Sequence, residues 1–359
     1  MENNAQALSG LKKEDFQKVV QGKEVDLFFL RNASGMEVAI TNYGGALVAI
    51  MGPDRDGNYA NIIQGHDNID DCINSPEPFL STLVGRYGNR ICHGKFTLNN
   101  KEYSLAINNG PNHLHGGPTN YSRRLWLSEP DAEGVTFVMC SPDGDENYPG
   151  NLEARVRYTF TAENELRIEL SATTDALTVV NLTNHAYWNL SGIGAGTALN
   201  HELKLHAAKW LPTDQTLIPT GELLPVAGTP MDFTQSKPLG RDLEADFPAL
   251  KYGKGYDNCW AVDGWKPGTL CRVAELFDSV SGRLMAVESD QPGVQVYTGN
   301  WLGHGELTNK AGGRYADYDG VAIECQDFPD SPNKPHFPST ELRPGEEYHR
   351  TIRFRFSVK

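Results

Sequence analysis

A histidine within a row of hydrogen-bonding side chains is the clearest chemical signal in this sequence. Segment 181–190 reads Asn-Leu-Thr-Asn-His-Ala-Tyr-Trp-Asn-Leu. In a strand, alternate side chains lie on opposite faces, so His185 and Tyr187 would share a polar face opposite a mainly apolar one. Such a row suits a polyhydroxyl ligand, with His185 available as a proton donor or acceptor. An ordinary solvated strand face is the alternative interpretation.

A glutamate within an apolar strand is the second signal. Segment 320–327, Gly-Val-Ala-Ile-Glu-Cys-Gln-Asp, places Glu324 and Gln326 on one face and Val321, Ile323 and Cys325 on the other. Burying a Glu is costly unless it is paired or functional. Partial desolvation would raise its pKa from about 4.3 toward the range of a useful general base. Glu324 is therefore a candidate base, or else a strand-face carboxylate in a surface salt bridge.

Two turn-rich segments offer further polar groups. Segment 85–91, Gly-Arg-Tyr-Gly-Asn-Arg-Ile, presents Asn89 and Arg90 as donors for sugar hydroxyls, although a strand-end turn with solvated arginines is an alternative. In segment 108–117, His113 and His115 are two residues apart and would face the same way in an extended chain. The two glycines that follow allow a ligand to approach the backbone closely. A metal could bind this histidine pair, but a third ligand at metal-site spacing is missing, so we expect no metal.

The remaining candidates carry weaker signals. Gln295 and Tyr297 occur together in segment 293–300, and Asp257 stands beside a Gly-flanked turn. Segment 192–196 is Gly-rich but opens no helix of a βαβ unit, which argues against a dinucleotide site. We therefore expect no cofactor.

The hydrophobic pattern predicts an all-β fold. Segments 37–41, 154–161, 166–173 and 351–358 alternate between apolar and polar residues, and turn-forming clusters separate the strands. Residues 11–20 are the best helical stretch in the first hundred residues. Many short strands, 36 Gly and 21 Pro indicate a large antiparallel β-sandwich with few short helices. No linker or fixed repeat divides the chain, so we expect one domain over residues 1–359.

Composition excludes several classes of function. A net charge of -14 argues against nucleic acid and anionic membranes as partners, because both require phosphate-neutralising Lys and Arg. No apolar run reaches 18 residues, and the N-terminus lacks the features of a secretory signal, so we expect a cytoplasmic protein. The six cysteines are scattered without a Cys-x-x-Cys pair, which favours six buried thiols over disulfides or structural zinc.

Taken together, these segments resemble the aldose 1-epimerase (galactose mutarotase) family from about residue 20 to the C-terminus. The matching motifs follow the family order and occur at 85–91, 112–117, 181–187, 217–222, 255–257, 292–300, 324–326 and 342–348. The resemblance implies a galactose mutarotase-like β-sandwich with an open cleft. It also implies the interconversion of α and β anomers of free aldoses such as D-galactose and D-glucose.

The resemblance also implies roles for individual residues. Glu324 matches the family's general base, His185 its general acid, and His115 its second histidine, which binds and polarises the sugar. Sugar-binding positions are matched by Asn89, Arg90, Tyr187, Asp257 and Gln295. His113 matches no required family residue, so its role stays open.

Three other functions remain as alternatives. A hexose-phosphate epimerase on the same fold would need a basic pocket, and Arg123-Arg124 is the only adjacent pair of arginines. A non-catalytic carbohydrate-binding protein should lack the acid–base pair. A glycosidase normally uses two carboxylates, whereas the proposed pair is Glu with His. We expect a monosaccharide substrate and a monomer or weak homodimer; departures such as Asn258 leave the preferred sugar open.

Overall fold

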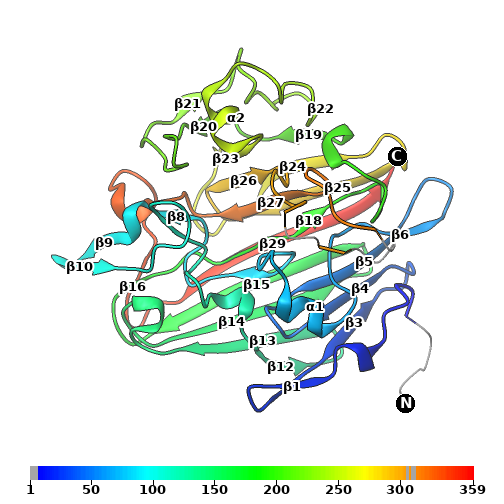
Figure 1. Ribbon diagram of the computed structural model, residues 1–359, viewed down its shortest axis with the longest axis horizontal. Coiled ribbons are helices and arrows are strands. Elements are labelled where there is room, and N and C mark those ends of the chain that lie inside the picture. Colours follow the sequence, from blue (N-terminus) through cyan, green and yellow to red (C-terminus); the bar gives the residue numbers. More distant parts are fainter. Residues whose placement is uncertain (1–6, 305–306, 309–312) are drawn as a thin grey trace.

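Antiparallel strands make up most of the protein in the computed structural model, which describes residues 7–304, 307–308 and 313–359 (Figure 1). The largest sheet has nine strands and extends through most of the molecule. In spatial order they are β12 (Leu127–Pro130), β13 (Gly134–Ser141), β14 (Leu152–Phe160), β15 (Glu165–Thr174), β29 (Tyr348–Val358), β25 (Arg283–Ser289), β24 (Cys271–Phe277), β19 (Glu202–Leu205) and β22 (Lys237–Pro238).

Two smaller sheets pack against the nine-stranded one. The six-stranded sheet has the order β18 (Tyr187–Trp188), β27 (Val321–Gln326), β26 (Gly293–Tyr297), β23 (Asp257–Ala261), β20 (Lys209–Leu211) and β21 (Leu224–Pro225). The four-stranded sheet has the order β3 (Leu27–Arg31), β4 (Glu37–Thr41), β5 (Leu47–Pro53) and β6 (Tyr59–Asn61).

Short strand pairs complete the fold and include the segments nearest the candidate site. They are β1 (Lys18–Val20) with β2 (Lys23–Val25), β9 (Lys95–Leu98) with β10 (Lys101–Ser104), β8 (Arg90–Ile91) with β11 (His113–Leu114), β16 (Thr178–Val179) with β28 (Glu341–Leu342), and β7 (Leu83–Val84) with β17 (Thr183–Asn184).

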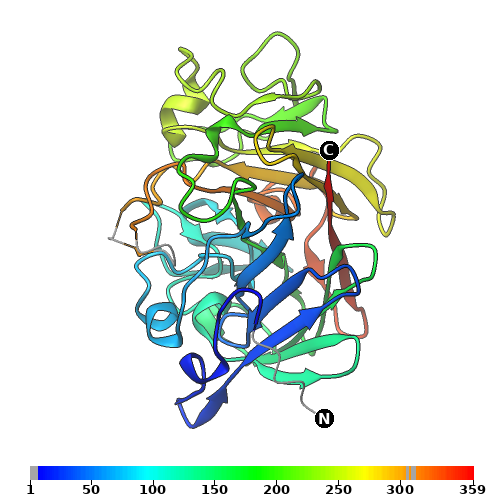
Figure 2. The same cartoon turned by 90° about the vertical axis from the view of Figure 1, so that its right-hand side faces the viewer.

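One hydrophobic core joins the layers. Phe28 of β3 meets Phe137 of β13 with ring centroids 5.8 Å apart, and Trp188 of β18 lies 4.8 Å from Phe354 of β29. The same core extends from Met36 near the start of the chain to the last strand, so early and late segments pack together (Figure 2). The expected antiparallel β-sandwich is therefore confirmed.

The long strands follow the predicted alternation. Inward and outward residues alternate along β14, as the sequence predicts for a strand with one covered face. Segment 37–41 coincides with β4, and the strands predicted at 166–173 and 351–358 lie within β15 and β29. In β15 and β29 the period of two arises because one face packs against the core, whereas β4 is buried on both faces.

Helix is scarce and occurs where the sequence did not indicate it. The described α-helices are α1 (Ile69–Asn74) and α2 (Pro248–Gly253). The expected helix over 11–20 is wrong, since that segment forms a 3₁₀ turn at Lys13–Asp15 and then strand β1. Its charged residues bury little apolar surface, and the β-branched Val19 and Val20 favour a strand.

The cysteines are less buried than expected, although all six are free thiols. Cys259 and Cys325 are buried, whereas Cys140 is exposed and the other three are half-buried. The expectation of six buried thiols is wrong because Cys140 lies on an outward position of β13. Among the described residues no helix is long and apolar enough to cross a membrane.

A buried arginine ties together the loops beside the candidate site. Arg86 is 1% exposed, and its guanidinium donates to the backbone oxygens of Pro149, Gly150 and Ser141 and to the hydroxyls of Ser141 and Thr178. Buried polar groups need such partners, because an unpaired one costs about 1–3 kcal/mol. Arg86 is thus a structural residue that fixes the turn leading to Asn89 and Arg90.

Replacing Arg86 with Met should lower the free energy of unfolding by about 3 kcal/mol, because it leaves several buried oxygens without donors. Urea denaturation would measure the change. Arg155→Met is the matched control, since Arg155 is a half-buried surface arginine paired with Glu129, and its loss should cost no more than about 0.5 kcal/mol. Equal effects of the two substitutions would contradict the structural role of Arg86.

Candidate active site

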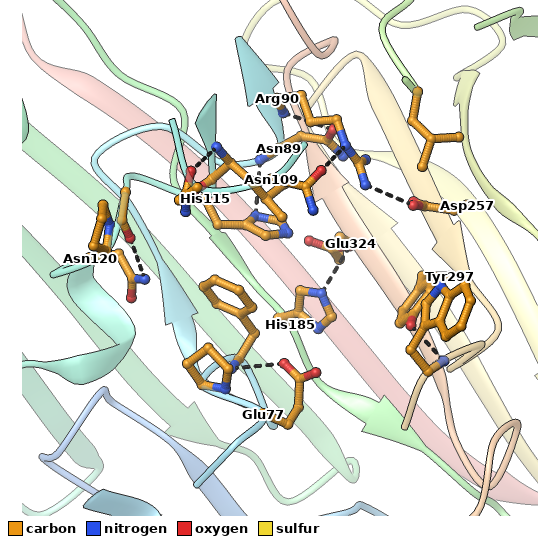
Figure 3. A pocket seen from close by; sticks show the side chains of 18 of the residues that line it. Glu77, Asn89, Arg90, Asn109, His115, Asn120, His185, Asp257, Tyr297 and Glu324 are labelled. Atoms are coloured by element: carbon orange, nitrogen blue, oxygen red, sulfur yellow. Dashed lines mark hydrogen bonds and ion pairs between the residues drawn. The ribbon is translucent and has the colours of Figure 1, made fainter. Parts of the chain in front are cut away.

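The candidate site is an open pocket of about 460 Å³ at the edge of the six-stranded sheet (Figure 3). That volume lies in the range of small-ligand sites. Strand β27 contributes Glu324, the segment between β17 and β18 contributes His185, and the turn after β11 contributes His115. Residues far apart in the sequence therefore meet in one cavity.

Glu324 projects into the pocket from a strand that is buried on both faces. Every residue of β27 is buried, with Val321, Ile323 and Cys325 in the main core. Glu324 is 1% exposed, and its Oε2 atom accepts no hydrogen bond within the described part of the chain. Burial raises the pKa of this carboxyl well above its usual range; the charge of Asp257 raises it further, while Arg90 opposes the shift.

His185 faces Glu324 across the pocket floor. Its backbone N–H donates to the oxygen of Thr82, and its ring Nε2 lies 3.6 Å from Oε1 of Glu324, just beyond hydrogen-bond distance. Phe79 and Tyr187 pack on the ring, at centroid distances of 6.0 and 4.8 Å. Burial lowers the pKa of His185 to about 4, because the charged ring loses its hydration.

The opposite pKa shifts leave one proton to be shared by this pair. Burial of both groups favours the protonated form of Glu324 and the neutral form of His185. Moving that single proton gives a carboxylate beside an imidazolium, with no change in total charge. Interacting groups of this kind titrate as a unit, so the pair can present a base and an acid to one ligand.

His115 is held as a hydrogen-bond donor by a reciprocal contact with Asn89. The backbone N–H of Asn89 donates to Nδ1 of His115, and the backbone N–H of His115 donates to the oxygen of Asn89, both at 3.1 Å. A neutral ring that accepts at Nδ1 carries its proton on Nε2. His115 can therefore donate from Nε2 to an oxygen of a ligand.

His113 does not face the same way as His115, contrary to expectation. Strand β11 ends at Leu114, and His115 adopts a φ of 50°, which turns its side chain out of the alternating pattern. The Nδ1 of His113 contacts the oxygen of Ala106, and its Nε2 contacts the hydroxyl of Tyr148. His113 is thus a buried structural histidine.

A chain of polar contacts forms one wall of the pocket. Arg90 donates to Asp257 Oδ2 at 3.1 Å and to Asn109 Oδ1 at 3.1 Å, and Gln295 donates to Asp257 Oδ1 at 2.6 Å. Arg90 and Asp257 line the cavity, but Gln295 does not. Gln295 lies behind Asp257, a position suited to orienting that carboxylate.

Segment 181–190 is not the single strand that its pattern indicates. It forms two short strands, β17 and β18, and all its residues are buried. His185 and Tyr187 line the pocket, whereas Asn181 and Asn189 bond backbone oxygens of neighbouring loops. Asn181 and Asn189, two members of the predicted ligand-binding row, are therefore structural.

His115, His185 and Glu324 together offer three potential metal ligands whose atoms lie within 4.8 Å of one another. The tautomer of His115 weighs against this use. A metal at Nε2 would displace the proton that the Asn89 contact places there. The same three groups suit proton transfer without that conflict.

Comparisons with known proteins place this chain in a family. The family model described as aldose 1-epimerase matches residues 26–355. The chain belongs to the aldose 1-epimerase family. It is 41% identical over 330 residues to galactose mutarotase of Bos taurus, covering 92% of this chain and 94% of the relative. It is 36% identical over 340 residues to aldose 1-epimerase of Escherichia coli, covering 93% and 96%.

A solved structure of the aldose 1-epimerase fold agrees. The aldose epimerase homologue from C. elegans superposes with a TM-score of 0.85 at 30% identity, covering 93% of this chain and 99% of that one. The fold described above is therefore that of an aldose 1-epimerase family member.

Several pocket residues of this family member carry no recognisable sequence signal. Glu77, Phe79 and Trp301 line the cavity, yet none lies in a segment whose pattern indicates a ligand site. Phe79 packs against His115 in a tilted arrangement with ring centroids 4.6 Å apart, and Trp301 is 47% exposed at the rim. A Glu between two prolines, Pro76 and Pro78, is the one feature that could have drawn attention to this loop.

The ring of His115 should stay neutral, with its proton on Nε2, as the pH passes through about 6.5, where an ordinary histidine titrates. Burial lowers its pKa well below the usual 6.5, and the neighbouring His185, Arg90 and His113 act in the same direction. Two-dimensional ¹⁵N–¹H NMR of the histidine rings would report the tautomer. Titration of His115 near pH 6.5, or a proton on Nδ1, would contradict this geometry.

Proposed function

We propose that the protein interconverts the α and β anomers of free aldohexoses such as D-galactose and D-glucose. Membership of the aldose 1-epimerase family supports this activity, and the relative from Bos taurus is named galactose mutarotase. The single observation that carries the proposal is the placement of His185 Nε2 3.6 Å from Glu324 Oε1 inside a cavity large enough for one sugar.

The reaction requires one proton to leave an oxygen and another to arrive at a second oxygen. Glu324, as the carboxylate, removes the proton from the C1 hydroxyl, and His185, as the imidazolium, protonates the ring oxygen O5. The C1–O5 bond then breaks and C1 becomes an aldehyde. After rotation about the C1–C2 bond, O5 adds to the other face of the aldehyde, with the proton transfers reversed. Positioned acid–base groups contribute about 10²–10⁴-fold to such steps.

The other pocket residues bind and orient the sugar. His115 donates from Nε2 to a sugar oxygen and polarises it, while Asn89, Arg90, Tyr187 and Asp257 contact hydroxyl groups. Gln295 holds Asp257 in its orientation, so we place it as a positioning residue that supports sugar binding. The acid–base reaction itself needs neither a cofactor nor a metal.

A hexose-phosphate substrate is less well supported by the charges of the pocket. Arg90 is paired with Asp257, and the remaining pocket arginine, Arg123, shares the cavity with Glu77 and Glu324. A dianionic phosphate would require several unpaired cations. A purely carbohydrate-binding role would leave the buried, proton-sharing pair without a use.

The free thiols and the net charge support a proposal for the cellular location and the partners of the protein. We infer that its partner is a small monosaccharide and that it acts in the cytoplasm, where its six free thiols remain reduced. Its net charge of -14 supports neither nucleic acid nor an anionic membrane as a partner. We expect a monomer or a weak homodimer.

Glu324→Gln and His185→Asn should each lower kcat for anomerisation by at least about 100-fold, because each removes one proton-transfer group while leaving a polar side chain in its place. Polarimetry on freshly dissolved α-D-galactose and α-D-glucose measures the rate, with Glu133→Gln as an exposed control. Wild-type rates equal to the buffer blank on both sugars would contradict the proposed activity. Active variants would contradict the two assigned roles.

A further inference from the structure

Glu77 is a pocket carboxylate with no part in the reaction described above. It lies in the loop between α1 and β7, flanked by Pro76 and Pro78, whose rings restrict the backbone. The hydroxyl of Ser75 donates to the backbone oxygen of Glu77 at 2.7 Å, and the N–H of Phe79 donates to its Oε1 at 3.1 Å. The carboxyl is therefore held in place before any ligand arrives.

The second carboxylate oxygen of Glu77 is left available for a ligand. Among the described residues, no hydrogen bond or ion pair is made by its Oε2, although Arg123 lines the same cavity. Burial raises the pKa of Glu77 to about 7, and the Phe79 N–H and Arg123 oppose that rise. Tyr187 and Tyr297 also face this carboxyl and feel its charge.

Glu77 lies on the side of the pocket opposite the wall formed by Arg90 and Asp257. In Figure 3, Glu77 reaches into the pocket from one side, Arg90 and Asp257 occupy the other, and His185 and Glu324 lie between them. A sugar whose C1 and O5 meet the central pair would thus present its remaining hydroxyl groups to both walls. Arg90, Asp257 and Asn109 bond one another, whereas Glu77 has a free oxygen.

We propose that Glu77 is a specificity-determining residue that hydrogen-bonds a hydroxyl group of the sugar remote from C1. This inference rests on the proposed anomerisation of free aldohexoses. A fixed, partly desolvated carboxyl selects strongly for a hydroxyl at the matching position, because a sugar without that hydroxyl leaves the carboxyl unpaired in the closed complex.

Glu77→Gln separates this role from a structural one. The amide oxygen of Gln still accepts the Phe79 N–H, so the loop and the packing of Phe79 on His115 and His185 are preserved. Only the free oxygen changes, from a carboxylate oxygen to an amide nitrogen. A merely structural residue would tolerate this exchange or would lower kcat for every sugar alike.

The test combines the variant with sugars that lack one hydroxyl. KM and kcat are measured by exchange NMR for D-galactose and its 2-, 3-, 4- and 6-deoxy analogues, with wild type, Glu77→Gln and the exposed control Glu133→Gln. In wild type and the control, we expect removal of one particular hydroxyl to raise KM about tenfold. In Glu77→Gln, removal of the same hydroxyl should raise KM less than about twofold. The other deoxygenations should affect all three proteins equally, with kcat little changed.

Two negative results can be told apart. If wild type is active but every deoxygenation has the same effect in Glu77→Gln as in wild type, Glu77 contacts no sugar hydroxyl and the inference is wrong. If wild type anomerises none of the sugars, the proposed function is wrong, and the inference about Glu77, which rests on it, is wrong as well.

Discussion

Burial of Glu324 on a strand that is covered on both faces is the constraint on which the site depends. One face of β27 packs Val321, Ile323 and Cys325 into the main core, so the register of the strand cannot slip without exposing them. That register directs Glu324 into the pocket and away from bulk water. The resulting rise in its pKa, matched by the fall in the pKa of His185, is what lets the pair share a proton.

The opposite wall of the pocket is made of turns, and a second buried charge holds it in place. Arg86 anchors the loops behind the turn that carries Asn89 and Arg90. Asn89 then fixes the ring of His115 through two backbone contacts. Strand β27 therefore presents Glu324, and the segment between β17 and β18 presents His185. Hydrogen-bonded turns present the groups that bind the sugar, an arrangement that keeps binding groups preorganised.

The sequence could predict the sandwich because its long strands alternate strictly, and it could predict His185 and Glu324 because polar residues interrupt apolar strands. It could not predict that Asn181 and Asn189 bond backbone oxygens, since structural and ligand-binding amides look alike in one sequence. The side chains of His113 and His115 point in different directions because His115 adopts a positive φ, which no local sequence pattern encodes. Glu77 and Gln295 reach their positions through tertiary packing, one lining the cavity and the other lying behind its wall.

The pH dependence of kcat/KM for α-D-galactose tests the shared proton most directly. The productive pair holds one proton, so activity should fall at low pH, as the lowered pKa of His185 near 4 is passed and the pair gains a second proton. It should fall again at high pH, as the raised pKa of Glu324 is passed and the shared proton is lost. The account predicts a bell-shaped profile with the same limbs in Glu77→Gln. Activity that does not fall as the pH drops through about 4, or that does not fall at high pH, would contradict it.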